Sequence, residues 1–354
     1  MSSVTSSSVA LVAGASGIVG IGVTQRLVAD GWRVICASRS GGGDIAGTEG
    51  IALDLMDPQA CRRALAKHTD ITHVFFTAYQ PAASRAAEVA PNLAMLRHLV
   101  EAVSAVAPAL EKVVLTTGAK FYGIQWGQTK TPCRETDPRQ LPPNFYYDQE
   151  DFLRQAQQGQ RWSWVNLIPP FVSGFAVGNP MNLVMGIGIY AAISKEMGLP
   201  LRFPGSAGAY DALHQIADAH IIGSAANWAA RSDAAANQAF NVTNGDPARW
   251  CNTWPVIAQG LGMAWAEPKT MPLADVMPDQ QALWDRIVER EGLRKIDINR
   301  IVNWAWVDYM LRMSHDVVLE TGKIRRAGFH ECIETDRVFA QRLQELQQHK
   351  VLPA

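Results

Sequence analysis

Residues 8–20, SVALVAGASGIVG, decide the fold of this chain. The apolar run 8–14 is typical of a buried strand, and residues 18–30 follow it with the pattern of a helix. A GxxGxxG motif joins the two segments, with its glycines at Gly14, Gly17 and Gly20. A strand, a glycine-rich turn and a helix in this order predict a dinucleotide-binding unit.

Each glycine of this motif has its own expected role. Gly14 permits the tight turn, Gly17 lets the backbone approach a pyrophosphate, and Gly20 allows close packing of helix and sheet. The N-terminus of the helix offers free N–H groups and a positive dipole to the phosphates. Glycines also occur in ordinary strand–helix turns, so the prediction of a dinucleotide site depends on the position of the motif between a strand and a helix. The residues of this turn that we expect to bind the cofactor are Gly14, Ser16, Gly17, Ile18 and Val19.

The first half of the chain alternates apolar runs with helical patterns. Strands are expected at residues 8–14, 33–38, 50–55, 73–78, 112–117 and 162–168, with another at 239–242. Helices are expected at 18–30, 58–67, 92–106 and 146–157, and a long loop at 118–144. Continuously apolar strands that are separated by helices predict a parallel sheet covered on both faces. The fold class is therefore α/β, a doubly wound Rossmann sheet.

The later part of the chain is rich in Met and Trp and mostly helical in pattern. We expect residues 1–170 plus about 211–245 to form the Rossmann NADP-binding domain. Residues of about 171–210 plus 246–354 are expected to form a smaller, mostly helical substrate-binding lobe.

Composition limits the partners of this protein. The chain has 354 residues, a formal net charge of -1 and a hydrophobic content of 48%. This near-neutral balance gives no reason to expect a nucleic acid or an anionic membrane as partner. Its five cysteines are scattered and form no CxxC pair, so we expect neither a disulfide framework nor a metal site. The oligomeric state is left open, with a homodimer as one option.

Two segments bear on localisation. Residues 1–8 are Ser-rich and carry no Lys or Arg, unlike a signal peptide. The longest later apolar stretch, 182–194, is too short to span a bilayer. We therefore expect a cytoplasmic protein.

The end of the second strand distinguishes NAD from NADP. An acidic residue there would bind the ribose 2′-hydroxyl, but the chain has Ser38 and Arg39, and no acid before Asp44. Arg39 can pair with a 2′-phosphate, so we expect NADPH as the cofactor, although a solvated strand-end arginine is the alternative. Asp54 and Leu55 follow the third strand, where this fold contacts the adenine. A turn-forming Asp54 is an equal alternative.

The carboxyl ends of the other strands border the same crevice in this fold. From these ends we expect further cofactor contacts by Ala78, Tyr79, Thr117, Ile168 and Phe171.

The catalytic residues depart from the usual pattern. Most short-chain dehydrogenases place a Lys four positions after the catalytic Tyr, but Glu150 follows Tyr146 and Asp151 follows Tyr147 at that spacing. A carboxylate would not lower the pKa of a phenol, so we interpret both acids as first-turn residues favoured by the helix dipole. Lys120, just past the fifth strand, could supply the missing charge.

Two segments carry a specific resemblance. TGAKFYG at 117–123 and NFYYDQEDF at 144–152 are similar to paired signatures of the progesterone 5β-reductase/iridoid synthase family, atypical extended short-chain dehydrogenases. The similarity continues through GASGIVG, ASR, DITHVFF, MNLVMGIGIYAAISKE, LRFPG and AFNVTNGD, and is weakest in the last hundred residues.

The resemblance implies a reaction and its residues. The family reduces activated C=C bonds of enones and enals with NADPH, so steroid-like and terpenoid-like compounds are candidate substrates. Carried over by motif, the catalytic residues are Lys120 and Tyr146, and both would also contact the cofactor. The chain has Phe121 where the family commonly has His, and Gly123-Ile124 where it has Gly-Pro. These departures put the substrate in doubt rather than the chemistry.

The substrate pocket is less clearly marked. The aromatic and Met side chains that follow the sixth strand are expected first of all to belong to the hydrophobic core. The alternative is that they line a substrate pocket. The expected pocket residues are Tyr122, Phe171, Met181 and Met185.

Two other functions remain open at this point. The first is an extended short-chain carbonyl reductase or epimerase, against which the missing YxxxK argues. The second is a non-enzymatic, NADP-sensing regulatory protein, which would have no need of Lys120 and Tyr146.

Overall fold

The computed structural model describes residues 8–41 and 45–354. The expectations for residues 1–7 and for Asp44 therefore lie outside the described residues. The described chain is centred on a seven-stranded parallel sheet in the order β10-β6-β5-β4-β1-β2-β3. Its strands are β1 (Val9–Ala13), β2 (Arg33–Ser38), β3 (Thr48–Ala52), β4 (His73–Phe76), β5 (Lys112–Thr116), β6 (Ser163–Ile168) and β10 (Gln238–Asn241). The predicted α/β fold class is confirmed.

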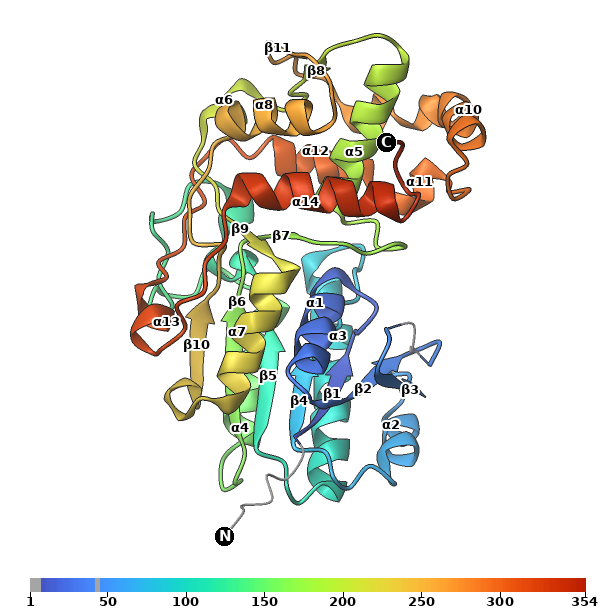
Figure 1. The fold of residues 1–354 in the computed structure, drawn as a ribbon. Helices are drawn as coiled ribbons and strands as arrows, with labels where there is room; N and C mark the ends of the chain where they lie inside the picture. The colour runs from blue at the N-terminus through green and yellow to red at the C-terminus, as the bar shows by residue number, and fades with distance from the viewer. Residues whose placement is uncertain (1–7, 42–44) are drawn as a thin grey trace.

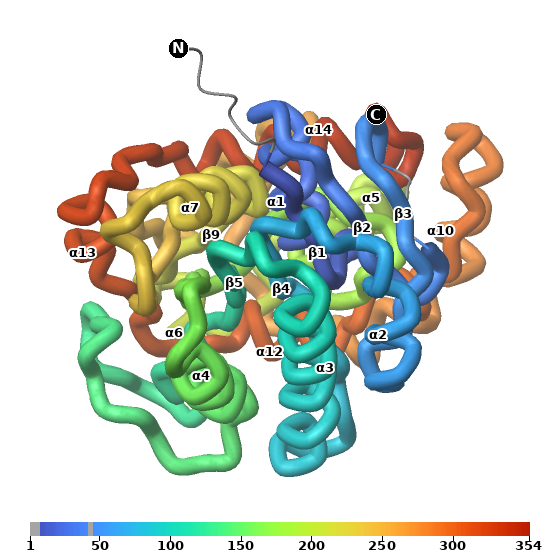
Figure 2. Tube along the Cα trace, turned by 90° about the horizontal axis from the view of Figure 1, so that it is seen from below, coloured from blue at the N-terminus to red at the C-terminus, as the bar shows by residue number. Residues whose placement is uncertain are grey.

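Helices cover both faces of the sheet, as Figure 2 shows. One face carries α1 (Ile18–Ala29) and α7 (Ala219–Arg231), and the other carries α2 (Pro58–Leu65), α3 (Arg85–Val106) and α4 (Phe145–Ala156). Alternate residues of one strand serve the two cores: Val12 packs with residues of α1 and α7, while Leu11 packs with residues of α2 and α3. This two-sided burial explains why the strands are continuously apolar.

The strand order reverses beside β1. This strand pairs with β2 on one side and β4 on the other, so the crossovers leave it in opposite directions. Open α/β sheets bind ligands outside the carboxyl ends of the strands at such a switch point. The turn between β1 and α1 lies at this end.

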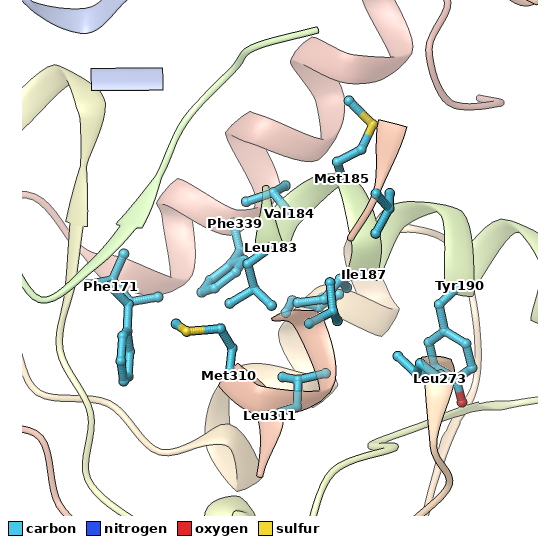
Figure 3. Close-up of a cluster of buried hydrophobic side chains, with 14 of the residues drawn as sticks. Phe171, Leu183, Val184, Met185, Ile187, Tyr190, Leu273, Met310, Leu311 and Phe339 are labelled. Atoms are coloured by element: carbon cyan, nitrogen blue, oxygen red, sulfur yellow. The ribbon is translucent and has the colours of Figure 1, made fainter. Parts of the chain in front are cut away.

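Most of the remaining helices gather above the carboxyl ends of the strands (Figure 1). They are α5 (Leu183–Glu196), α6 (Ala207–Asp211), α8 (Trp250–Gly260), α9 (Leu273–Val276), α10 (Gln281–Glu291), α11 (Ile298–Ile301), α12 (Trp304–Leu311) and α14 (Thr335–Gln348). A buried cluster that includes Ile187 of α5, Leu311 of α12 and Phe339 of α14 holds them together (Figure 3). We propose that these helices form the substrate-binding lobe, made of residues of about 171–210 plus 246–354.

The segment around α13 (Gly322–Arg326) departs from this division. Its Ile324 and the following Phe329 are buried in the core cluster that also holds Phe240 of β10 and residues of α7. Part of the last hundred residues therefore packs on the Rossmann sheet.

Two elements, β3 and α3, differ from the sequence prediction by more than two positions at one end, and the predicted loop contains short turns. β3 ends at Ala52, so Asp54 and Leu55 follow it as a turn. α3 begins at Arg85, seven positions before the predicted start at Asn92, because Ser84 caps it and Pro91 is accommodated inside it. Short 3₁₀ turns at Ala119–Tyr122 and Ile124–Trp126 stand in the predicted loop.

Two short parallel pairs were not predicted. β7 (Phe171–Ser173) pairs with β9 (Ile216–Asp218), and β8 (Leu201–Arg202) pairs with β11 (Trp265–Ala266). Strands of two or three residues carry too little periodicity to be found in a sequence. In the part of the chain that is described, no helix is long and apolar enough to cross a membrane.

Candidate functional site

A pocket of about 250 Å³ opens at the carboxyl end of the sheet, between the strands and α12. The glycine-rich turn, the ends of β4 and β5, the start of α4 and the strand β7 all contribute to its walls. Sequence-predicted site residues that the structure brings together here are Gly17, Ile18, Val19, Ala78, Tyr79, Thr117, Lys120, Tyr146, Phe171 and Met181.

The glycine-rich turn has the predicted geometry. Gly14 has a φ of +81°, and a Cβ there would lie 2.7 Å from the backbone nitrogen of Ala78. A Cβ on Gly20 would lie 2.1 Å from the carbonyl oxygen of Gly14, so this residue must also be glycine. A Cβ on Gly17 would meet only that same oxygen, at 3.4 Å. The protein alone therefore has room for a Cβ at Gly17.

Asn144 holds Tyr146 and the Lys120 segment together. Its Oδ1 accepts a hydrogen bond from the Tyr146 N–H at 3.2 Å and so caps α4. Its Nδ2 donates to the carbonyl oxygen of Lys120 at 2.9 Å. An Asn directly before a helix is a strong N-cap signal, so the sequence could have revealed this residue.

The Tyr146 hydroxyl lies over Gly118. A Cβ on Gly118 would sit 3.2 Å from this oxygen, so the absence of a side chain makes room for it. Tyr147 has a different environment, because its hydroxyl donates to the carbonyl oxygen of Phe121 at 2.5 Å and accepts from the Gln140 N–H at 2.9 Å. Of the tyrosine pair, only Tyr146 lines the pocket.

The charges at the pocket follow from burial. Burial, with the nearby Glu88, raises the pKa of the half-buried Tyr146, so this phenol stays protonated at neutral pH. The Lys120 side chain is exposed as a whole, but the atoms packed around its amine lower its pKa, with Arg85 adding to the effect and Glu88 opposing it. Tyr79 donates a short hydrogen bond to Glu88.

Glu150 and Asp151 are not first-turn acids, which corrects the sequence interpretation. The acid in the first turn of α4 is Asp148. Glu150 is buried and accepts hydrogen bonds from Arg154 at 2.9 Å and from Asn166 at 2.8 Å, so its charge is compensated inside the structure. Asp151 forms a two-pronged ion pair with Arg139, both distances being 2.7 Å.

Several predicted cofactor residues lie outside this pocket. The side chains of Leu55 and Ile168 are buried in the core clusters, so only their backbone is left for the predicted cofactor contact. Ser38 is half-buried at the end of β2, where the predicted adenosine end of the cofactor would lie. Of the predicted cofactor residues, Ser16, Arg39 and Asp54 are exposed along this edge. Asp54 accepts a hydrogen bond from the Met56 N–H at 2.9 Å, which is the turn-forming role weighed above.

Tyr122 and Met185 do not line the pocket, which corrects the sequence expectation. Tyr122 is buried, and its hydroxyl donates to Asn241 at 2.6 Å. Met185 is fully buried on the side of α5 away from Met310 (Figure 3). Met181 precedes the N-cap Asn182, so the two methionines are not one helical turn apart.

One wall of the pocket was missed. α12 contributes Trp306, Tyr309 and Met310 from the last sixth of the chain. Their spacing of three and four positions marks one helical face, but nothing in the sequence shows that this face meets the Rossmann domain.

The chain is similar to known proteins over most of its length. Residues 51–353 match a family model described as a PRISE-like Rossmann-fold domain. The chain is 32% identical to the (S)-8-oxocitronellyl enol synthase ISY1 of Nepeta racemosa, over 98% of this chain and 93% of that protein. It is 29% identical to the 3-oxo-Delta(4,5)-steroid 5-beta-reductase of Arabidopsis thaliana, with 98% and 93% covered. The UDP-glucose 4-epimerase of Thermotoga maritima shares the fold, with a TM-score of 0.68, 15% identity, and 96% and 99% covered.

Proposed function

The chain belongs to the PRISE-like Rossmann-fold family, and from this premise we propose that it is an NADPH-dependent ene-reductase. It is an oxidoreductase of the short-chain dehydrogenase type, as its relatives are. The proposed reaction is conjugate reduction of the C=C bond of an α,β-unsaturated carbonyl compound, an enone or enal. The observation that carries this proposal is that Tyr146 and Lys120 both line the pocket that opens beside the glycine-rich turn.

The residues at the switch point suit a dinucleotide. Gly17 presents open backbone, and the first N–H groups of α1 have no side-chain cap. Free N–H groups at a helix N-terminus bind phosphate. Arg39, exposed at the end of β2, would hold the 2′-phosphate that distinguishes NADPH from NADH.

Tyr146 would stabilise the charge that develops during the reaction. Bound NADPH would supply a hydride to the β-carbon of the substrate. Negative charge would then develop on the carbonyl oxygen, where the protonated Tyr146 hydroxyl would donate a hydrogen bond to it, and a proton from solvent on the α-carbon would complete the saturated product. A donor aimed at this oxygen lowers the barrier because its hydrogen bond strengthens as the charge grows.

Lys120 would add a positive charge to the same pocket. Glu150, whose charge is balanced by Arg154, occupies the position where most short-chain dehydrogenases have the catalytic lysine. A positive charge at the pocket must therefore come from another element. Asn144 ties the backbone of Lys120 to the start of α4, which fixes the lysine segment relative to Tyr146. Tyr146 has a raised rather than a lowered pKa, so the proposed role of Lys120 is attraction for the developing oxyanion.

A direct comparison of substrates tests the proposed function. NADPH oxidation is measured with cyclohexenone, with cyclohexanone and without substrate. The proposal requires turnover of the enone only. Turnover of the saturated ketone would favour a carbonyl reductase, and NADPH binding without any turnover would favour a regulatory protein.

Arg39→Ala tests the choice of cofactor. Charge-assisted hydrogen bonds to a phosphate contribute about 1.5–3 kcal/mol, so the KM for NADPH should rise about 10- to 100-fold. The KM for NADH should stay nearly constant. Arg62→Ala, which removes an exposed arginine on α2, is the matched control. Equal effects of Arg39→Ala on both cofactors would remove Arg39 from the 2′-phosphate site.

The pH profile of activity tests Lys120. Because its surroundings lower its pKa, Lys120 loses its charge as pH rises at a lower pH than an ordinary lysine, whose pKa is about 10.4. The raised pKa of Tyr146 keeps that phenol neutral over the same range. The alkaline decline of kcat/KM should therefore move to higher pH in Lys120→Arg and disappear in Lys120→Met, at a reduced rate. Superimposable profiles for wild type and Lys120→Arg would refute this role.

A further inference from the structure

Two of the motifs found in the sequence meet at Asn241, away from the pocket. This residue ends β10, the strand at one edge of the sheet, and belongs to AFNVTNGD at 239–246. Its Oδ1 accepts a hydrogen bond of 2.6 Å from the hydroxyl of Tyr122, which belongs to TGAKFYG at 117–123. Both side chains are buried and neither lines the pocket, so the reaction proposed above leaves both without a role.

The side-chain amide of Asn241 joins three segments that are distant in the sequence. Its Oδ1 receives the Tyr122 hydroxyl, while its Nδ2 donates to the carbonyl oxygens of Cys133 at 3.1 Å and of Glu320 at 3.0 Å. Its backbone N–H donates to the Glu135 carboxylate at 2.8 Å. A buried amide whose donors and acceptor are all paired holds its neighbours in one arrangement. Asn241 is therefore a rigid support for Tyr122.

Tyr122 ends the short 3₁₀ turn that carries Lys120. The turn consists of residues 119–122, and Gly123 closes it with a φ of +78°. A single 3₁₀ turn has little stability of its own, so its contacts with the rest of the protein must fix its position. The bond between Tyr122 and Asn241 ties the turn to the sheet two positions after Lys120.

The other side of the turn is tied to α4 by two side chains. Asn144 donates to the carbonyl oxygen of Lys120 at 2.9 Å, and Tyr147 donates to that of Phe121 at 2.5 Å. Asn144 therefore keeps this side attached when Tyr147 is replaced. Within residues 8–41 and 45–354, the one side-chain hydrogen bond from the turn to β10 is that of Tyr122. Loss of this bond frees the β10 side of the turn.

We propose that Tyr122 and Asn241 are positioning residues for Lys120, because they hold the 3₁₀ turn so that the lysine stays at the pocket beside Tyr146. This inference rests on the proposed function, since it concerns a residue of that site. It also gives Tyr122 a role different from the pocket contact expected from the sequence. One neutral hydrogen bond can favour the correct position of the turn by a factor of about 2 to 12.

The pKa of Lys120 reports where its amine lies. Lys120 borders the pocket and also a smaller cavity behind it, which is lined by Arg85 and Glu88 of α3 and by Tyr146 of α4. Burial of the amine lowers its pKa, while Glu88 opposes this effect and Arg85 adds to it. An amine that moves outward with a loosened turn regains water, so its pKa rises toward the ordinary value of about 10.4.

The test measures this pKa directly. NMR titration of the protein with ¹⁵N-labelled lysine side chains follows Lys120, whose signal is identified by its loss in Lys120→Arg. Tyr122→Phe should raise the pKa of Lys120 toward that of an ordinary lysine. The same variant should lower kcat for cyclohexenone by about 2- to 12-fold, the factor that the lost hydrogen bond contributes.

Tyr190→Phe is the matched control. Tyr190 is also buried, and its hydroxyl donates one hydrogen bond, to the carbonyl oxygen of Arg202 at 3.0 Å, on α5 of the other helical layer. Both variants lose one hydrogen bond of a buried phenol, so both should melt at a lower temperature. Tyr190→Phe should nevertheless keep the wild-type pKa of Lys120 and the wild-type kcat.

The outcomes separate this inference from the proposed function, because the titration needs no substrate. A raised pKa of Lys120 in Tyr122→Phe, but not in Tyr190→Phe, supports the positioning role even if wild type fails to reduce cyclohexenone, in which case only the proposed function fails. An unchanged pKa of Lys120 in folded Tyr122→Phe, or an equal shift in Tyr190→Phe, overturns the inference.

Discussion

Replacing Tyr146 by Phe should lower kcat for an enone by about 10²–10³, the usual loss when one oxyanion donor is removed. The phenol is protonated because burial raises its pKa, and its oxygen stands over Gly118 in the pocket. A residual rate should remain, because an enone is already activated and positioning of the hydride does not depend on the phenol. Steady-state kinetics with NADPH and cyclohexenone measure this loss.

Tyr147→Phe is the control for this prediction. It removes two hydrogen bonds that lie outside the pocket, to Phe121 and Gln140. The variant should melt at a lower temperature but keep a nearly normal kcat. A large loss of rate in Tyr147→Phe, together with a normal rate in Tyr146→Phe, would show that the second tyrosine is the catalytic one.

The combination with Lys120→Ala tests whether the two groups act together. Residues that serve one developing charge are non-additive, so the double variant should lose much less than the product of the single losses. Asn144, which bonds to both segments, gives this coupling a structural basis. Fully multiplicative losses would show that the two residues act independently.

Replacing Gly17 by Val should abolish measurable NADPH binding in a protein that remains folded. A Cβ at Gly17 has only an ordinary contact within the protein, 3.4 Å from Gly14, but it would occupy the approach of the pyrophosphate. Loss of two hydrogen bonds to a charged phosphate, each about 1.5–3 kcal/mol, weakens binding at least about 100-fold. Calorimetry gives the affinity, and circular dichroism confirms the fold.

Gly20→Ala provides the contrast. Its Cβ would lie 2.1 Å from the carbonyl oxygen of Gly14, so the turn itself must shift. This variant should lose stability as well as binding. A folded Gly17→Val protein with normal NADPH affinity would remove the glycine motif from the cofactor site.

The local parts of the molecule could be predicted from the sequence. The need for glycine at Gly20 arises from Gly14, a few positions away, so the GxxGxxG motif indicated it directly, whereas Gly14 also meets the distant backbone of Ala78. The choice of Tyr146 over Tyr147 rested on the family resemblance, and the structure places only Tyr146 at the pocket.

The features that could not be predicted depend on contacts between distant parts of the chain, or on a helix whose start departs from the usual sequence pattern. Tyr309 reaches the pocket only because α12 packs above the sheet, and a helical period does not reveal its partner. Met181 and Met185 are four positions apart, which is the spacing of one helical face. Because α5 begins only after its N-cap Asn182, Met181 lies outside the helix and does not share a face with Met185. The start of α3 was missed because its first turn is exposed and carries no buried apolar stripe, and because Pro91 interrupts the helical pattern.

The most direct test of conjugate reduction follows the hydride itself. The enzyme is supplied with NADPH that carries deuterium at the transferable position of the nicotinamide, together with cyclohexenone, and the product is examined by NMR. The account predicts a saturated ketone with deuterium on the carbon β to an intact carbonyl. An allylic alcohol with deuterium on the carbinol carbon would contradict it, because the hydride would then have reduced the C=O bond instead of the C=C bond.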